Sequence, residues 1–469
     1  MDELQMTAAE LVAAYSTGGL SPLEVLQAVL DHAHASQPDV NAFREIDVDG
    51  SLAAATASER RWRAGAPRGP LDGVPVSVKD MIATRGMATR FGSRTLPANH
   101  LIDVDAPAVA ALREAGAIIF GKTTTSEFGH KIVTDSPLTG CTRNPWDRTL
   151  TSGGSSGGAG AALALGIGPL ALGTDGGGSI RIPACWNGVF GFKPSFKRVP
   201  TAAGDDPTRL SNIGPMSRSV DDAALMLQVL CGARHDDWEI APHAPLHWRD
   251  GLQDGVQGLR IAFSPDLGLT KVDDEIASSV AAAASVFEDL GAHVDIVDRP
   301  PPLHGYMSSR MHSIQWMCRV SHTVRAAAPH QRSEFDPDLL ELADIAHCLP
   351  ASALTDALQA RHELAWGMHR FFHRYDLLLT PAFHRHPPPV PGLPADLRCA
   401  PPLTSWCNQT MQPAASIPCG RSAKGLPIGL QVVAQRYRDD LVLRACHAYE
   451  EARGRFPCAP LASAQRLGA

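Results

Sequence analysis

At the centre of the chain stands the run PLALGTDGGGSIRIP, residues 169–183. Its first six residues are apolar or small and predict a buried strand, which leads directly into three consecutive glycines. Ser179 follows the glycines and opens a short helical turn. Glycines that follow a strand permit a tight turn or a close approach of the backbone to another group.

The elements on both sides of this run alternate between strand and helix. The predicted strands are 74–78, 117–120, 259–263, 293–297, 376–380 and 429–433, and the predicted helices are 106–115, 159–165, 221–230, 273–290 and 439–452. This alternation predicts an α/β fold with a central twisted, mixed and largely parallel sheet that helices cover on both faces. We expect one domain over residues 1–469.

Three parts of this expected domain have different patterns. Residues 1–70 predict an N-terminal helical segment, in which Gly18, Gly19 and Pro22 separate two helices and Ser21 caps the second. Residues 71–220 contain the glycine-rich runs and are the expected core. Residues 300–403 have helical patterns followed by a proline-rich loop, and we expect this variable region to shape a ligand pocket.

Composition excludes several classes of function. The 469 residues are 44% hydrophobic and 19% charged, with a formal charge of -7, which is typical of a folded soluble protein. No Lys/Arg-rich run is present to neutralise phosphates, so we expect no nucleic-acid partner. The acidic start and the absence of any apolar run of roughly 18 residues predict a cytoplasmic protein without a membrane contact. The sequence contains no metal-ligand spacing such as His-Glu-x-x-His, so we expect no metal site.

Ser179 is the candidate nucleophile in the central run. The backbone N–H groups of Gly176, Gly177 and Gly178 can surround one point and stabilise an oxyanion beside it. An alcohol needs a base at neutral pH, and a lysine serves if burial lowers its pKa. Lys79, at the end of the strand 74–78, is the candidate base. The alternative is a solvated lysine in an ion pair with Asp80.

A second glycine-rich run, SGGSSGG at 152–158, allows a different nucleophile. It lacks the Gly-Lys-Ser/Thr ending of a phosphate loop. Around Ser156 it matches the letter pattern of a nucleophile elbow, which would suit an esterase with a Ser-His-Asp triad. An elbow follows a strand directly, however, and residues 148–152 are polar and irregular.

Taken together, Lys79, the run 152–158 and the run 173–183 resemble the amidase signature family. Further similar segments are GKT (121–123), EFG (127–129), NPW (144–146), GFKP (191–194), QPAA (412–415) and GLPIGLQ (425–431). The resemblance covers essentially the whole chain. It implies the amidase signature fold and a hydrolase, without metal or organic cofactor, that cleaves a carboxylic amide to an acid and an amine or ammonia.

The resemblance also implies a role for each site residue. Ser179 would form the acyl-enzyme, Ser155 would relay protons, and Lys79 would be the base, with a cis peptide bond at Ser155. The implied oxyanion hole consists of the backbone amides of Gly176, Gly177, Gly178 and Ser179. Asp175 and Arg181 would support that loop, unless they form a surface ion pair, and Ser156 would support Ser155. Phe128, Gly129 and His130 would border the substrate pocket.

The sequence departs from the family pattern at three places. Gly176 stands where many relatives have a larger residue, which loosens the oxyanion loop unless neighbouring side chains clamp it. Trp186 is less usual at its position and either shapes an aromatic substrate pocket or packs in the core. Ile182 replaces the glutamine of the branch that amidates misacylated transfer RNA. This last departure favours a free-standing amidase acting on an uncharged aryl or alkyl amide. The family resemblance, rather than any sequence feature, makes a homodimer a possible assembly.

Three alternatives to a free-standing amidase are compatible with the sequence. The chain is a glutamine-hydrolysing subunit of the amidotransferase type, an esterase that uses Ser156, or a partner-binding subunit that retains an inactive site.

Overall fold

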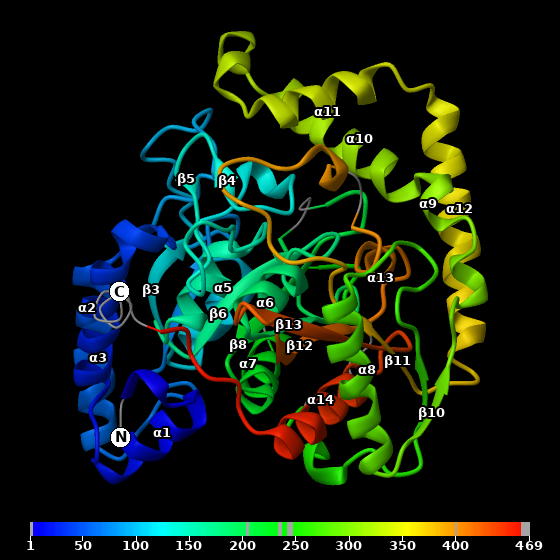
Figure 1. Cartoon of the computed structure of the whole chain (residues 1–469). Coiled ribbons are helices and arrows are strands. Elements are labelled where there is room, and N and C mark those ends of the chain that lie inside the picture. The colour runs from blue at the N-terminus through cyan, green and yellow to red at the C-terminus, as the bar shows by residue number, and fades with distance from the viewer. Residues whose placement is uncertain (1–2, 203–205, 233–236, 242–246, 399–400, 461–469) are drawn as a thin grey trace.

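The computed structural model describes residues 3–202, 206–232, 237–241, 247–398 and 401–460, and both predicted N-terminal helices are present. α1 (Ala8–Thr17) ends at left-handed Gly18, and α2 (Pro22–Val40) begins after Ser21. The Ser21 hydroxyl accepts a hydrogen bond from the amide of Glu24, in a capping box that fixes this start. α3 (Val48–Arg63), which no pattern predicts individually, packs beside α2 on the left in Figure 1.

One large sheet has the strand order β1-β3-β2-β6-β8-β7-β12-β13-β11-β9-β10. In that order the strands are Phe43–Ile46, Ile118–Thr123, Pro75–Lys79, Leu170–Asp175, Asn212–Ser217, Phe190–Lys193, Ala414–Arg421, Pro427–Ala434, Leu377–Pro381, Arg260–Phe263 and His293–Ile296. Parallel ladders join β3, β2 and β6, and also β11, β9 and β10. Antiparallel ladders form the centre and attach β1. The predicted mixed sheet is confirmed, with its parallel ladders in two blocks.

The patterns at β1, β7, β8 and β12 do not predict strands. Their sequences, FREI, FGFK, NIGPMS and AASIPCGR, contain charged residues, glycine or proline that interrupt an apolar alternation. These segments are extended because neighbouring strands pair with them, which is a tertiary effect that local patterns do not encode.

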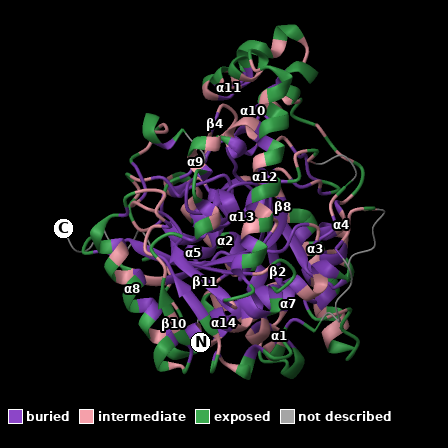
Figure 2. Cartoon of the chain, turned by 90° about the vertical axis from the view of Figure 1, so that its right-hand side faces the viewer, coloured by how far each residue is buried: buried purple, intermediate pink, exposed green. Residues whose placement is uncertain are grey.

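Helices cover both faces of the sheet, as β6 illustrates. Its residues alternate between the faces: Leu170 and Leu172 pack in the same core cluster as α7 (Val220–Cys231), whereas Ala171 packs with α5 (Gly157–Ala164). The α7 side also carries α4 (Pro107–Glu114), α8 (Asp274–Asp289) and α14 (Asp439–Arg453). Figure 2 shows the resulting buried centre.

The variable region adds a layer of helices at the top and right of Figure 1. It comprises α9 (Tyr306–Ser309), α10 (Met311–Ala326), α11 (Pro337–His347) and α12 (Ala351–Phe371), with residues 399 and 400 outside the described part. α10 packs against α11 and α12 and reaches the core at α13 (Ser405–Gln409). Figure 2 shows that α10 and α11 project beyond the buried centre, and α11 has only two buried residues. The described part of the proline-rich stretch 387–402 is a loop, as predicted, apart from a short 3-10 helix at Ala395–Leu397.

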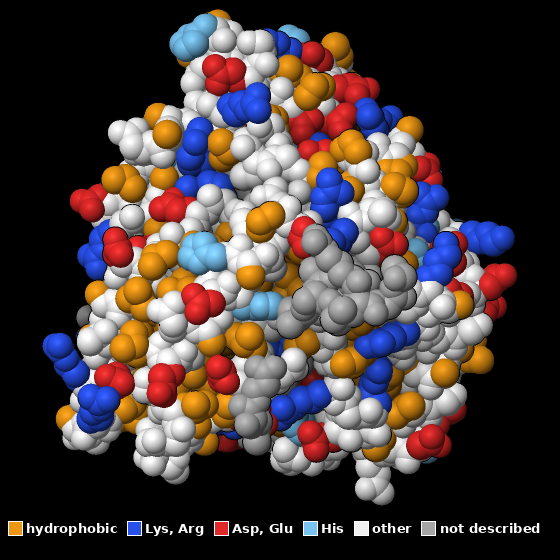
Figure 3. Space-filling model, turned by 60° about the vertical axis from the view of Figure 1, so that its left-hand side comes forward, with side chains coloured by type: hydrophobic (Ala, Val, Ile, Leu, Met, Phe, Trp, Pro, Cys, Tyr) orange, Lys and Arg blue, Asp and Glu red, His pale blue; other side chains and the backbone are white. Residues whose placement is uncertain are grey.

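No helix in the described ranges has both the length and the apolar character needed to cross a membrane. Within those ranges, no group of three or more His, Cys, Asp or Glu side chains is arranged to hold a metal ion. Acidic and basic side chains intermingle on the face shown in Figure 3, so this face has no broad patch of one sign.

Candidate active site

Lys79 is the last residue of β2 and is completely buried. Its Nζ lies 2.6 Å from Oγ of Ser155, 3.0 Å from Oγ of Ser156 and 2.8 Å from Oγ1 of Thr174. Burial lowers the pKa of the Lys79 amine well below 10.5, while the carboxylate of Asp175 opposes the shift and the guanidinium of Arg319 adds to it. The environment thus favours an uncharged amine surrounded by hydroxyl groups.

The alternative interpretation of Lys79, a solvated lysine paired with Asp80, is wrong. Asp80 is itself buried, and its carboxylate lies 3.2 Å from the guanidinium of Arg44. Among the described residues Lys79 has no ion pair within 4.0 Å. The lysine therefore lacks the contact that would keep it protonated.

The loop 152–158 brings two serines to this amine. The Gly154–Ser155 peptide bond is cis, as the family resemblance implies. The amide of Ser156 donates to the carbonyl of Ser179 at 3.1 Å, which joins this loop directly to the central glycine run. The predicted meeting of Lys79, Ser155 and Ser156 is therefore present, and Ser179 is adjacent through the backbone.

Ser156 has the contacts of a supporting residue. It is completely buried, and its hydroxyl donates to the carbonyl of Thr174 at 3.1 Å while also contacting Lys79. No histidine is among its described hydrogen-bond partners. This geometry is unsuited to an exposed esterase nucleophile with a histidine base.

Ser179 lies at the edge of a cavity, and 9% of its surface is exposed. Its hydroxyl has no hydrogen-bond partner among the described residues, so the predicted link from Ser155 to Ser179 is not closed in this structure. Of the four expected oxyanion amides, Gly178 donates its N–H to Asp175 Oδ1 at 2.8 Å. The amides of Gly176, Gly177 and Ser179 have no acceptor within the described part of the chain.

Asp175 and Arg181 form a buried ion pair rather than a surface one, so the surface alternative is wrong. Two N–H groups of Arg181 donate to the carboxylate at 2.9 and 3.0 Å, and the amide of Ile180 donates at 3.1 Å. Arg181 also donates to Gln431 and Asn408. Burial alone would raise the pKa of Asp175, but the charge and hydrogen bonds of Arg181, the charge of Lys193 and the hydrogen bond from Asn408 together outweigh it and lower that pKa overall. The pair ties the start of α6 (Arg181–Asn187) to the glycine run.

The variable region contributes a clamp on this run that the sequence did not predict. His312 and Trp316 lie one turn apart on α10, and their rings stack with centroids 5.8 Å apart. His312 Nε2 lies 3.0 Å from the carbonyl oxygen of Gly176, which it contacts as a donor in the Nε2–H tautomer. Burial lowers the pKa of His312 to about 4, which keeps the ring neutral near pH 7. The Thr404 hydroxyl donates to the carbonyl of Gly177 at 2.6 Å.

The glycine at 176 is explained by Trp316. A Cβ atom at residue 176 would lie 2.8 Å from Trp316 Cζ3, which is closer than real contacts allow. The same ring donates its Nε1–H to the carbonyl of His130 at 3.0 Å. Trp316 therefore fills the space that a larger residue at 176 would need. Its ring holds the glycine run in place although residue 176 is a glycine. The spacing of His312 and Trp316 fits one helix face, but that signal alone does not identify a partner.

A cavity of about 370 Å³ opens between Ser179 and the variable region. Gly129 and His130 line it, as the resemblance implies. Its apolar wall is formed by Met307, Trp316, Met317, Leu342, Ile345 and Leu397. Charged side chains of both signs also line it, and Arg398 contacts Asp338 and Glu341 at 3.0 and 3.1 Å. The cavity thus combines a mainly apolar wall with charges that largely pair with one another.

Two predicted pocket residues lie elsewhere. Phe128 stacks on Phe91 with ring centroids 5.7 Å apart and is not part of the cavity wall. Trp186 is buried, with its ring edge against Phe383 at 5.0 Å and its Nε1–H donated to the carbonyl of Arg385. Trp186 thus belongs to the core, in agreement with its second interpretation, and it is absent from the cavity wall.

The chain is similar to known proteins over nearly its whole length. Residues 24–443 match the family model described as Amidase. The chain is 34% identical to an acylamidase of Rhodococcus erythropolis over 96% of this chain and 95% of that protein. It is 31% identical to a subunit of the glutamyl-tRNA(Gln) amidotransferase of Lachnospira eligens, over 97% and 100% of the two chains. Among solved structures, a bacterial aryl acylamidase of the amidase signature family has a TM-score of 0.87 at 31% identity, over 95% of this chain and 96% of that one.

Proposed function

Because the chain belongs to the amidase signature family, whose members hydrolyse carbon–nitrogen amide bonds, we propose that it cleaves a linear carboxylic amide through an acyl-enzyme on Ser179. The observation that carries this proposal is the environment of Lys79, a buried amine whose partners are all hydroxyl groups. A lysine in this setting is a general base at neutral pH rather than a charged surface group.

The hydrogen bonds around Lys79 favour Ser155 as the proton relay. The Ser156 proton is donated to the Thr174 carbonyl, so the Ser156 oxygen accepts one N–H of the neutral amine. The Thr174 hydroxyl points to the sulfur of Met81 at 4.0 Å, and its oxygen accepts the second N–H. The lone pair of Nζ is left for the proton of Ser155, its remaining partner.

The reaction then follows in two halves. Lys79 takes the Ser155 proton, Ser155 takes the Ser179 proton, and Ser179 Oγ attacks the amide carbon after its side chain rotates toward Ser155. The free amides of Gly176, Gly177 and Ser179 stabilise the oxyanion, while the Gly178 amide keeps Asp175 in place. The proton then passes from Lys79 through Ser155 to the nitrogen of the leaving amine, which departs. Water then attacks the ester by the same relay and releases the acid.

The cavity wall suggests the class of substrate. Methionine, leucine and tryptophan side chains near Ser179 favour an aryl or alkyl acylamide, because they cannot pair with a charged group. The similarity to acylamidases supports this assignment. The competing proposal, hydrolysis of glutamine in an amidotransferase, is supported by the similarity to the amidotransferase subunit. Glutamine carries two charges that the apolar part of this wall does not compensate, and Ile182 is buried where that branch has a glutamine.

Trapping with a fluorophosphonate tests the nucleophile. We expect mass spectrometry to find a single adduct on Ser179, and no adduct in the Ser179→Ala variant. Ser313 lines the same cavity, so Ser313→Ala is the matched control and should label normally. An adduct on Ser156, or full amide hydrolysis by Ser179→Ala, would contradict the mechanism.

A substrate panel tests the specificity. Aryl anilides and aliphatic acylamides should be hydrolysed with higher kcat/KM than glutamine, and a preference for glutamine would favour the amidotransferase. The cytoplasmic location stays a prediction from the sequence, and the homodimer stays a prediction from the family resemblance.

A further inference from the structure

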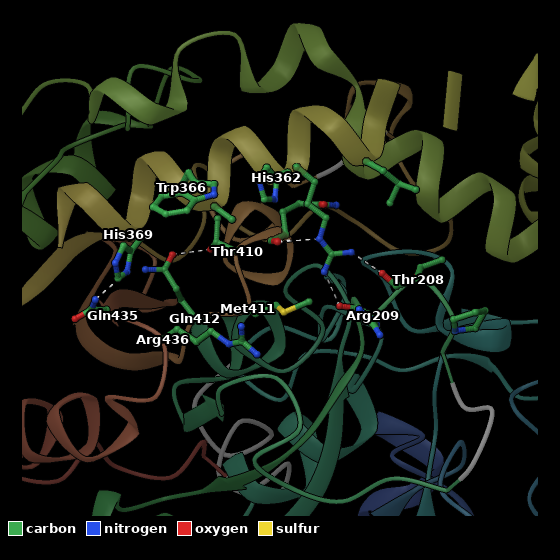
Figure 4. Close-up of a pocket in the computed structure, with 15 residues that line it drawn as sticks. Thr208, Arg209, His362, Trp366, His369, Thr410, Met411, Gln412, Gln435 and Arg436 are labelled. Atoms are coloured by element: carbon green, nitrogen blue, oxygen red, sulfur yellow. Dashed lines mark hydrogen bonds between the residues drawn. The ribbon is translucent and has the colours of Figure 1, made fainter. Parts of the chain in front are cut away.

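A second cavity lies away from the one at Ser179 and shares none of its lining residues. Its volume is about 700 Å³, large enough for a small organic ligand. One face of α12 forms a wall, and segments 207–209, 409–412 and 435–436 form the rest (Figure 4). Nothing in the proposed amide hydrolysis uses this cavity.

An aromatic surface faces this cavity from α12. Trp366 is 56% exposed although it belongs to a helix that packs on the core. The rings of His362 and His369, four residues before and three after it, stand edge-on to Trp366 at 6.5 and 6.1 Å. Figure 4 shows the three side chains along the same helix face. Gln435 Nε2 lies 3.1 Å from His369 Nδ1, so the end of this surface is held in place. An exposed indole flanked by two imidazole rings is a platform for a flat ring.

The cavity is also positively charged. No Asp or Glu is among its described lining residues, whereas Arg209, Arg361 and Arg436 are. Arg361 is 8% exposed, and burial lowers its pKa to about 10, so it remains protonated near pH 7. It donates to the carbonyls of Thr208, Arg209 and Gln409 and to Gln315, and no carboxylate lies within 4.0 Å in the described chain. Its charge is therefore not neutralised by direct contact.

The other two arginines differ in their availability. Arg209 forms an ion pair with Glu239, which reduces its pull on a ligand. Asp206 further offsets the field, since its carboxylate acts on Arg361 at longer range. Arg436 stacks on the ring of Tyr437 at 4.5 Å and has no ion pair among the described residues. Arg436 is thus the arginine with donors left for a ligand.

We propose that this cavity binds a small aromatic anion, a carboxylate or a phosphate monoester. The flat ring stacks on Trp366, and the anionic group pairs with Arg436 in the field of Arg361. The volume accommodates a bicyclic ring with its anionic group. The assignment is independent of the proposed amidase mechanism, because it uses none of the residues near Ser179.

Calorimetric titration of the full chain tests the site with 1-naphthoate and 1-naphthyl phosphate, and with 1-naphthalenemethanol as the uncharged analogue. We expect one molecule of anion per chain and at least tenfold weaker binding of the alcohol. The tighter of the two anions identifies the anionic group that the site prefers. Failure of both anions to bind, or equal affinity for the alcohol, would overturn the proposal.

Variants locate the ligand. Arg436→Gln and Trp366→Ala should each weaken anion binding at least tenfold. The matched control is Arg438→Gln, an exposed arginine two residues away whose partner is Asp440. It should leave the affinity unchanged, and so should Leu342→Ala in the cavity at Ser179. Affinity that falls in Leu342→Ala but not in Arg436→Gln would place the ligand beside Ser179 and refute the site.

Discussion

The glycine-rich core and the variable region meet at Ser179, but they are built differently. In the core, Lys79, Asp175 and Arg181 are completely buried and held by several hydrogen bonds each. In the variable region, α11 buries only Leu339 and Ala343, and its neighbour Arg332 pairs with Asp344 in solvent. The reacting groups therefore depend on fixed backbone and desolvation, whereas the pocket wall depends on helices with fewer constraints. Substitutions in the two regions should therefore have effects on activity and stability that differ in kind and in size.

The largest expected effect tests whether burial of a lysine in the core serves the chemistry. Lys79→Met should reduce kcat/KM by about 10³- to 10⁴-fold, because the base is removed while the shape is nearly kept. The pKa of the folded-state amine is depressed, so the unfolded chain binds more protons near pH 7 and the native state bears a cost there. The variant avoids that cost, and its thermal midpoint should not fall. Steady-state kinetics and circular dichroism measure both.

Lys122 provides the matched control for this variant. It is a neighbouring buried lysine whose pKa burial lowers to about 7, but its partners include the hydroxyls of Thr84 and Thr89 rather than the serine loop. Lys122→Met should keep activity within about tenfold of the unmodified chain, since it takes no part in proton transfer. Equal losses in both variants would mean that the lysines are structural, and the comparison between the two regions would fail.

The next effect concerns stability and contrasts an ion pair of the core with one of the variable region. Arg181→Met leaves the Asp175 carboxylate buried without its counter-charge and should lower the free energy of unfolding by about 3–5 kcal/mol. Arg332→Met removes an exposed pair and should cost no more than about 1 kcal/mol. Urea unfolding followed by circular dichroism measures the difference. Similar losses of unfolding free energy in Arg181→Met and Arg332→Met would mean that the ion pairs of the two regions do not differ in their contribution to stability.

A smaller effect tests the contact between the regions. Gly176→Ala places a Cβ against Trp316 and should displace the oxyanion loop, with a loss of about 10²- to 10³-fold in kcat. Combining it with Trp316→Leu makes room, so the double variant should recover at least tenfold relative to Gly176→Ala. Trp316→Leu alone should mainly raise KM, since it removes part of the pocket wall. A double variant less active than Gly176→Ala would show that the two residues do not compensate.

The same division separates what the sequence predicts from what it does not. β2 has the alternation of a strand and β6 begins with apolar and small residues, so the sequence predicts both strands. Lys79 and Ser155 stand in local motifs, and the family resemblance carried by these motifs implies that they meet. It does not predict β7 and β8, because glycine and proline interrupt them and pairing alone makes them extended. Nor does it reveal the roles of His312 and Trp316, since the contact of His312 with Gly176 spans 136 residues along the chain. Helix periodicity does not say which distant loop a helix covers.

The smallest expected effect is electrostatic: the charge of a residue in the variable region acts on a residue of the core. The Arg319 guanidinium on α10 lies over the ring of Trp316 at 4.8 Å, and it is one of the groups that lower the pKa of Lys79. Lys79 acts as a neutral base, so activity is lost as the pH falls through its pKa. Arg319→Gln should raise that pKa and move the acid limb of kcat/KM to higher pH by less than about one unit, since the partly exposed charge is screened. Arg319→Lys keeps the charge and should keep the profile. If the acid limb of kcat/KM moves to lower pH in Arg319→Gln, or moves equally in both variants, then α10 acts on Lys79 by packing rather than by the electric field of the Arg319 charge.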